Sequence, residues 1–308
     1  MGPPRRLLVT GAGGFVGRHL LPVLGEHLPG AEAVAARADL ADPGAVEAEV
    51  HCIRPDACVH LAAISAVGAA REDPDRAWRV NLGGTLALAR AILTHSPGCL
   101  LLFASSADSY GESFRGGEPL GEEARLAPLN AYAATKAAAD LALGAMVPEG
   151  LRVVRARPFN HTGPGQTPAF VVPAFARQAA RIAAGLQPPV VQVGNLEPRR
   201  DFLDVRDVCA AYAKCLARGE ALPPGVILNL ASGQARRIGD VLDAVLREAG
   251  VEARIETSAA RLRPSDLPAA RGDATLASRL LGWAPRIPWE ETLRSVVADW
   301  RERVARGE

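Results

Sequence analysis

A glycine-rich segment near the N-terminus constrains the fold of this chain more than any other feature. Leu7 to Thr10 is a short apolar run with β propensity, and it leads directly into GAGGFVG at residues 11–17. The stretch that follows, RHLLPVLGEHL, has helical spacing despite an internal proline. In a strand, glycine turn and helix of this kind the backbone can approach a pyrophosphate, and the helix N–H groups face the anion. We therefore predict a dinucleotide site at Gly11, Gly14 and Gly17, with an ordinary structural turn as the alternative.

Apolar runs alternate with helix-like stretches along the first half of the chain. The expected strands are Leu7 to Thr10, Ala31 to Ala35, Ala57 to Leu61 and Cys99 to Ala104. The expected helices are Pro43 to Cys52, Asp75 to Leu93 and Tyr132 to Met146. Because the strands are continuously apolar rather than alternating, they predict a parallel sheet with helices on both faces. The expected fold class is α/β: a doubly wound parallel Rossmann sheet with a smaller α/β C-terminal substrate lobe.

The composition changes after the apolar run Leu151 to Arg157. Residues 158–200 are rich in proline and glycine, and Val226 to Leu230 is typical of one more strand. Helix-like segments follow at Ile238 to Ala249 and Glu290 to Arg303. We predict a dinucleotide-binding domain of residues 1–157, to which residues 201–232 cross back, and a substrate lobe of residues 158–200 and 233–308.

Charge and cysteine content exclude several classes of partner. The formal net charge is +1, and no lysine-rich tail or basic stripe with interleaved aromatics occurs, so we expect neither nucleic acid nor a membrane as partner. No segment approaches the roughly 18 uninterrupted apolar residues of a membrane span. The five cysteines contain no CxxC pair and the six histidines no metal spacing, so we expect no metal. These features favour a cytoplasmic protein that acts on a small molecule.

Lysine is rare in this chain, which makes one lysine informative. The chain has 35 lysines and arginines, and only Lys136 and Lys214 are lysines. Tyr132 and Lys136 are four residues apart on an expected helix and so share one face. An ammonium beside a phenol favours the phenolate and lowers the pKa of the phenol toward the range of a general acid or base. The pair predicts proton-transfer chemistry, with a chance coincidence of spacing as the alternative.

Five motifs in order carry a resemblance to a known family. They are GAGGFVG at residues 11–17, Asp39-Leu40, HLAA at 60–63, SSADSYG at 105–111 and YAATK at 132–136. In this order and spacing the chain resembles the extended short-chain dehydrogenase/reductases (the NAD-dependent epimerase/dehydratase family), which act mostly on nucleotide sugars. The resemblance implies that Ser106 supplies the hydroxyl of a Ser-Tyr-Lys site with Tyr132 and Lys136.

Asp108 distinguishes between activities within that family. In its 4,6-dehydratases a glutamate at this position takes the C5 proton of the sugar, whereas this chain has the shorter aspartate. The difference favours simple carbonyl reduction, and Asp108 is then expected to orient substrate hydroxyls at the catalytic site.

The resemblance also implies a set of cofactor-binding residues. Arg37, about 20 residues after the glycine segment, suits the 2′-phosphate of NADP(H), although a solvated arginine at this position would leave NAD(H) equally suitable. The predicted set is Gly11, Gly14, Phe15, Val16, Gly17, Arg37, Asp39, Leu40, Leu61, Ala62, Ala63, Asn81, Tyr132 and Lys136.

The second half most resembles the family members that act on GDP sugars. The resemblance implies that Asn160, Arg200 and Arg263 hold the GDP diphosphate and ribose, with Gln166 to Phe175 forming part of the guanosine pocket. The expected reaction is NAD(P)H-dependent reduction of the C4 ketone of a GDP-4-dehydro-6-deoxy-hexose, giving GDP-D-rhamnose. A nucleotide-sugar 4,6-dehydratase or 4-epimerase is the alternative, and a non-catalytic dinucleotide-binding protein is a remote one. Family habit also implies a homodimer through the helix that carries Tyr132.

Overall fold

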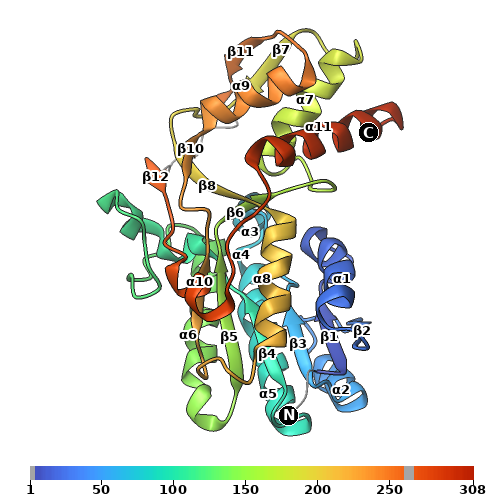
Figure 1. Ribbon diagram of the computed structural model, residues 1–308, viewed down its shortest axis with the longest axis vertical. Helices are drawn as coiled ribbons and strands as arrows, with labels where there is room; N and C mark the ends of the chain where they lie inside the picture. Colours follow the sequence, from blue (N-terminus) through green and yellow to red (C-terminus); the bar gives the residue numbers. More distant parts are fainter. Residues whose placement is uncertain (1–3, 260–266) are drawn as a thin grey trace.

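A six-stranded parallel sheet forms the larger part of the molecule (Figure 1). The computed structural model describes residues 4–259 and 267–308. The strand order is β2-β1-β3-β4-β5-β9, and every neighbouring pair is parallel. The strands are β1 (Arg6–Thr10), β2 (Glu32–Ala35), β3 (Ala57–His60), β4 (Leu100–Ala104), β5 (Arg152–Pro158) and β9 (Ile227–Leu230). The predicted parallel Rossmann sheet is confirmed.

Helices cover both faces of this sheet. Leu7 and Val9 point into a core beneath α1 (Phe15–His27) and α8 (Val205–Ala217). Leu8, which lies between them, points into a second core on the opposite face. That face is covered by α2 (Pro43–Ile53), α5 (Thr85–His95) and α6 (Ala131–Ala145). Because successive strand residues bury on opposite faces, the apolar runs are continuous, as the sequence indicated.

The helix expected over Asp75 to Leu93 is broken into three parts. α4 (Pro74–Trp78) leads into a π-helical turn, η1 (Arg79–Gly84), and then into α5; the short α3 (Val67–Glu72) precedes them. A Cβ at Gly84 would lie 2.7 Å from both Cβ and O of Leu40, so this turn packs directly on the segment after β2. The turn directs Asn81 into the interior, where it is buried.

Smaller sheets and three helices form the part at the top of Figure 1. β8 (Arg199–Asp204) pairs with β6 (Asn160–Thr162), β10 (Ala235–Arg237) and β12 (Ala269–Ala270), and β7 (Val190–Val193) pairs with β11 (Arg254–Thr257). α7 (Val171–Ala183), α9 (Ile238–Ala249) and α11 (Trp289–Ala305) share one apolar core. The sequence predicted α9 and α11 but not α7, which lies in a segment interrupted by proline and glycine.

The chain crosses between these parts after β8. β8 lies in a small sheet, whereas α8 and β9 return to the six-stranded sheet. The remaining elements are the 3-10 segments η2 (Ala107–Gly116) and η3 (Val147–Glu149) and the helix α10 (Thr275–Leu281). Across residues 4–259 and 267–308, every helix is too short or too polar to span a membrane.

Candidate active site

Ser106 and Tyr132 meet at the carboxyl end of β4. Ser106 follows this strand as the N-cap of η2, and its Oγ accepts the backbone N–H of Asp108 at 3.1 Å. Tyr132 lies in the first turn of α6, which begins where the Asn130 side chain accepts the backbone N–H of Ala133 at 2.9 Å. The Ser106 hydroxyl lies close enough to the Tyr132 phenol to influence its pKa. The two hydroxyls are therefore placed to act on one oxygen atom.

The environment of Tyr132 keeps its phenol protonated. Burial raises the pKa of Tyr132 well above its ordinary value, and the negative charge of Asp108 raises it further. The Ser106 hydroxyl acts in the opposite direction but does not cancel these effects. Sequence reasoning expected a lowered pKa because of Lys136, and this expectation is wrong for the structure, where burial dominates. At neutral pH the phenol therefore carries its proton.

Lys136 is a buried cation one helical turn after Tyr132. Its side chain is buried, and Nζ lies 4.3 Å from the centroid of the Phe103 ring on β4. Burial lowers the pKa of Lys136 to about 7, while the carboxylate of Asp140 opposes that shift. The ammonium is thus held between α6 and the Phe103 ring of β4.

The glycine segment has the shape that a dinucleotide requires. Gly11 has φ of 71°, and a Cβ there would lie 2.8 Å from the backbone nitrogen of Ala62. A Cβ at Gly17 would lie 2.4 Å from the carbonyl oxygen of Ala12. α1 begins at Phe15 with Gly14 as its N-cap, and no side chain caps its first N–H groups. These donors face outward for an anion such as a diphosphate.

His60 is hydrogen bonded to two threonine hydroxyls, and these hydroxyls bond in turn to backbone groups near the glycine segment. Thr85 donates its hydroxyl proton to the Asn81 carbonyl at 2.6 Å, so its oxygen accepts from His60 Nε2 at 2.9 Å. His60 Nδ1 then accepts the Thr10 hydroxyl at 2.7 Å, and Thr10 accepts the Ala62 N–H at 3.2 Å. This pattern assigns a neutral ring with the proton on Nε2. Burial lowers the pKa of His60 to about 3, and the charge of Lys136 lowers it too.

Asn81 links the loop after β3 to the catalytic helix. Its Oδ1 accepts the N–H of Ile64 at 2.8 Å, and its Nδ2 donates to the Ile64 carbonyl at 3.2 Å and to Thr135 Oγ1 at 3.0 Å. Leu61, Ala62 and Ala63 lie in this loop and are partly buried. The structure therefore brings these four predicted cofactor residues to one edge of the sheet.

The other predicted cofactor residues lie at the ends of β1 and β2. Arg37 and Asp39 are exposed after β2, and Leu40 beside them is buried. Asp39 Oδ1 accepts the N–H of Ala41 at 2.9 Å. Phe15 and Val16 open α1, and the Phe15 ring stacks on His161 with centroids 6.2 Å apart.

The predicted substrate residues lie around β6 and β8. Asn160 is exposed at the start of β6, opposite Phe202 of β8. Arg200 is partly buried, and its Nη1 donates to the carbonyls of Arg199 and Leu267, each at 2.9 Å. Asp108 is exposed near Tyr132. Arg263 lies outside the described residues.

The loop after β6 is held from two sides, which sequence reasoning missed. His19 of α1 bonds through Nε2 to the Pro164 carbonyl at 2.8 Å. From α11, Asp299 Oδ2 accepts the Gly165 N–H at 2.9 Å, and Arg303 donates to the Gln166 carbonyl at 3.2 Å. These partners are more than 130 residues apart in the chain, so no local pattern announces them.

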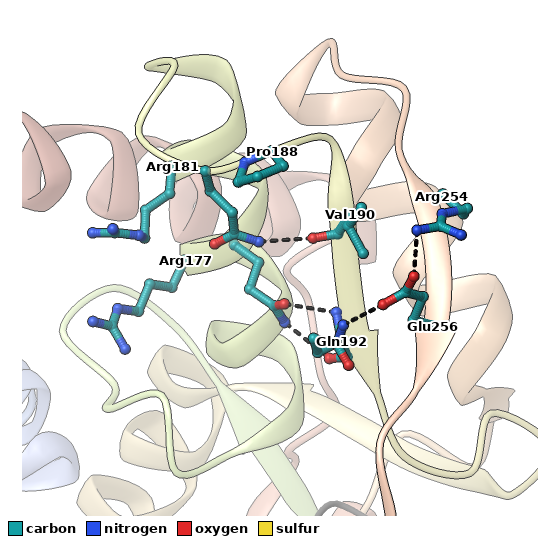
Figure 2. Close-up of a pocket in the computed structure, with 9 residues that line it drawn as sticks. Arg177, Arg181, Pro188, Val190, Gln192, Arg254 and Glu256 are labelled. Carbon is teal, nitrogen blue, oxygen red and sulfur yellow. Dashed lines mark hydrogen bonds and ion pairs between the residues drawn. The ribbon is translucent and has the colours of Figure 1, made fainter.

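A separate groove lies between α7 and the sheet of β7 and β11 (Figure 2). It has a volume of about 630 Å³ and contains none of the predicted site residues. Its lining includes Arg177 and Arg181 on one side and the ion pair of Arg254 with Glu256 on the other. Within residues 4–259 and 267–308, no group of three histidine, cysteine or acidic side chains is arranged to hold a metal ion.

Comparison with known proteins places the chain in a family. A family model described as GDP-mannose 4,6 dehydratase matches residues 25–296. The chain belongs to this family.

Two individual relatives and one solved structure are similar to this chain over most of its length. GDP-6-deoxy-D-mannose reductase of Pseudomonas aeruginosa is 40% identical over 303 residues, which cover 97% of this chain and 98% of that protein. GDP-6-deoxy-D-talose 4-dehydrogenase of Aggregatibacter actinomycetemcomitans is 28% identical, covering 90% of this chain and 91% of that one. The solved structure of RMD from Pseudomonas aeruginosa complexed with NADPH superposes with a TM-score of 0.88 at 37% identity, covering 98% of this chain and 100% of that one.

Proposed function

We propose that this chain reduces the C4 ketone of GDP-4-dehydro-6-deoxy-D-mannose with NADPH and gives GDP-D-rhamnose. The observation that carries the proposal is the protonated Tyr132 beside Ser106, in a chain 40% identical to a GDP-6-deoxy-D-mannose reductase over nearly its whole length. Reduction begins with a phenol that carries the proton to be transferred, and the protonated phenol is the form that this environment favours.

Each catalytic residue then has a defined task. Bound NADPH supplies a hydride to C4 of the sugar. Ser106 and Tyr132 donate hydrogen bonds to the C4 oxygen, and Tyr132 passes its proton to that oxygen as negative charge develops. Lys136 contributes a fixed positive charge beneath the phenol and binds the nicotinamide ribose. Asp108 orients hydroxyls of the sugar and keeps the phenol of Tyr132 protonated.

The cofactor proposal rests on the glycine segment and on Arg37. The open N–H groups of α1 receive the diphosphate, and the exposed Arg37 after β2 receives the 2′-phosphate of NADP(H). Asp39 and Leu40 flank the adenine, and Leu61, Ala62, Ala63 and Asn81 line the rest of the cofactor site. The structural relative complexed with NADPH supports NADP(H) over NAD(H).

The substrate proposal rests on the strands that continue from the catalytic sheet. Asn160 and Arg200 lie on neighbouring strands β6 and β8, and with Arg263 they are proposed to bind the diphosphate and ribose. Gln166 to Phe175 is proposed to form part of the guanosine pocket. In this proposal the sugar nucleotide lies between the dinucleotide-binding domain and the substrate lobe.

Assembly and location are further parts of the proposal. A homodimer through α6 is supported by Leu141 and Trp78, large apolar side chains that are 59% and 39% exposed on the neighbouring helices α6 and α4. A cytoplasmic location is supported by five cysteines that are all free.

A 4,6-dehydratase is the second candidate, because the matching family model is described by that activity. A dehydratase or epimerase first oxidises the sugar at C4, which requires Tyr132 to take a proton, and it regenerates its cofactor in each cycle. The short side chain of Asp108, where the dehydratases have a glutamate, favours the reductase.

Mixing the protein with NADPH and the GDP-4-keto sugar separates the two activities. We expect net loss of NADPH absorbance with formation of GDP-6-deoxy-D-mannose, whereas a dehydratase or epimerase leaves NADPH unchanged. Tyr132→Phe should lower kcat by about 10² to 10⁴-fold while GDP binding stays intact. In a thermal-shift panel GDP should stabilise the protein more than UDP or dTDP, and the opposite ranking would contradict the substrate assignment.

A further inference from the structure

A buried carboxylate lies one helical turn beyond Lys136. Asp140 is 0% exposed, and Tyr132, Lys136 and Asp140 follow each other at intervals of four residues on α6. Side chains at this interval lie along one face of a helix. The face that presents the phenol to the substrate therefore continues inward through an ammonium to a carboxylate.

Two arginines of β5 hold this carboxylate. Arg157 donates from Nη2 to Asp140 Oδ1 at 2.9 Å and from Nε to Oδ2 at 3.0 Å, and its side chain is 3% exposed. Arg155 Nη1 adds a third bond to Oδ1 at 3.2 Å. Burial alone would raise the pKa of Asp140, but the hydrogen bonds from Arg157 together with the positive charges of Arg157 and Arg155 contribute to holding that pKa below its usual value. A two-point guanidinium grip also fixes the orientation of the carboxylate.

Arg157 has further partners, so its position does not depend on Asp140 alone. Its Nη1 donates to the Tyr110 hydroxyl at 2.9 Å and to the Glu122 carbonyl at 3.1 Å. The Tyr110 hydroxyl donates in turn to Asn229 Oδ1 of β9 at 2.8 Å. The arginine is thus anchored by η2, by the segment after it and by the sheet.

Apart from Asp140, the groups named around Lys136 carry no negative charge that acts directly on its ammonium. Its Nζ faces the Phe103 ring of β4. His60 of β3 is near enough to feel the ammonium but is neutral. Tyr132 precedes it on α6, with Asp108 and Ser106 acting on that phenol rather than on Lys136. Among the described residues, Asp140 is the carboxylate that supports the charge of Lys136 against burial.

We propose that Asp140 is a positioning residue for the reduction: its carboxylate keeps Lys136 cationic in the buried site, and Arg157 keeps that carboxylate ionised and correctly oriented. The inference rests on the proposed function for its catalytic meaning. Asp140 and Arg157 then lie behind the Ser106, Tyr132 and Lys136 site. Asp140 controls the charge of Lys136 without contacting the substrate.

The scarcity of lysine allows a direct test by NMR. Protein labelled with ¹³C at the lysine side chains contains two labelled residues, Lys136 and the internal reference Lys214. In Asp140→Asn we expect the titration midpoint of Lys136 to fall by about 1–3 pH units, the size of effect that one nearby opposite charge exerts. The midpoint of Lys214 should not move. Asp140→Glu should restore most of the midpoint of Lys136.

Turnover gives the second readout. In Asp140→Asn the alkaline limb of the kcat profile should move to lower pH, so that activity lost at pH 7 is regained in part at pH 5. Asp140→Asn leaves the buried Arg157 without its carboxylate, which destabilises the fold. The double variant Asp140→Asn with Arg157→Met removes that unpaired charge. Its Lys136 midpoint should still lie below that of the wild type, but it should be displaced less than in Asp140→Asn because a neighbouring positive charge is lost too.

The outcomes separate this inference from the proposed function. A folded Asp140→Asn or double variant in which Lys136 titrates as in the wild type overturns the inference, as does a kcat that falls equally at every pH. If the midpoint moves but the wild-type protein does not oxidise NADPH with the GDP-4-keto sugar, the substrate assignment fails and the role of Asp140 toward Lys136 stands.

Discussion

The two lysines of this chain hold their ammonium groups in different environments. Lys136 is buried over an aromatic ring, where a compact cation fits between Phe103 and the residues of its own helix. Lys214 Nζ donates to the carbonyls of Gly282 at 2.9 Å and Leu281 at 3.5 Å, at the C-terminal end of α10. A cation there compensates the unpaired carbonyls that end a helix. One lysine therefore supports chemistry and the other stabilises a helix end.

His60 makes the stability of the protein depend on pH in the acid range. The ring is neutral in the fold, where its pKa is about 3, whereas the unfolded chain protonates near the ordinary value of 6.5. Between these values the unfolded state binds more protons, so stability is present above pH 6.5 and is lost as the pH falls toward 3. The loss is about 1.4 kcal/mol per pH unit in this window.

His60→Gln tests this account by comparison of unfolding free energies. At pH 7 we expect the variant to be less stable by roughly 1–3 kcal/mol, because the Thr10 and Thr85 hydroxyls lose their partner. At pH 4 this difference in unfolding free energy should become smaller or change sign, because the wild type loses stability as its unfolded chain takes up a proton at His60, whereas glutamine does not titrate. Denaturant unfolding of both proteins at the two pH values measures the gap, and a gap that is the same at pH 7 and pH 4 would contradict the prediction.

At the scale of elements, the tight start of α1 determines the cofactor site. The helix must begin close to the turn at Gly11 for its N–H groups to face a diphosphate, and Gly17 allows that approach because a side chain there would meet the Ala12 carbonyl. Gly25, two turns later on the same helix, is exposed with open space around its Cα. The two glycines share one helix but differ in what an added methyl group would meet.

Gly17→Ala and Gly25→Ala form a matched pair of variants. Gly17→Ala should weaken NADPH binding at least tenfold and destabilise the fold by about 1–3 kcal/mol, because the helix must move away from the turn. Gly25→Ala should bind NADPH normally and gain about 0.5–1 kcal/mol from its better helix propensity. Calorimetric titration with NADPH measures both, and equal affinities in the two variants would sink the proposed dinucleotide role of the turn.

The spacing of apolar residues predicted most helices and strands, but it did not predict where they are interrupted. The expected helix Ile238 to Ala249 has the bounds observed for α9, because its apolar residues follow one face without a break. The expected helix Asp75 to Leu93 contains a π-helical turn, which depends on the contact of Gly84 with Leu40 and so on tertiary packing. Motif order likewise indicated Ser106, Tyr132 and Lys136, but the network around His60 depends on residues from three separate elements.

At the scale of the whole molecule, the loop of residues 163–166 connects the two halves of the proposed site. It is bonded to α1 by His19 and to α11 by Asp299, and it leads into the proposed guanosine pocket. Phe15 at the start of α1 packs on His161 just before this loop. The helix proposed to receive the cofactor diphosphate thus also holds the loop that precedes the proposed nucleotide pocket.

His19→Ala should therefore weaken GDP binding although the residue lies on the cofactor helix. We expect a loss of about fivefold, equivalent to one hydrogen bond of about 1 kcal/mol. His27→Ala is the control, because His27 lies on the same helix but bonds only within it, to the Val23 carbonyl at 3.2 Å. Calorimetric titration with GDP compares the variants, and equal affinities for both would contradict the link between α1 and the pocket.

Gln178, which lines the groove between α7 and the sheet of β7 and β11, has a consequence for the behaviour of the protein at high concentration. Gln178 of α7 accepts the backbone N–H of Gln192 at 2.8 Å and donates to its carbonyl at 3.1 Å. Within the described part of the chain, β11 is the only strand that pairs with β7, so this side chain occupies the donor and acceptor on the other edge of β7. An unpaired strand edge is a template on which a second chain can add a strand. Because the Gln178 amide occupies both backbone groups of Gln192, we expect it to hinder the addition of a second chain at this edge and so to disfavour aggregation.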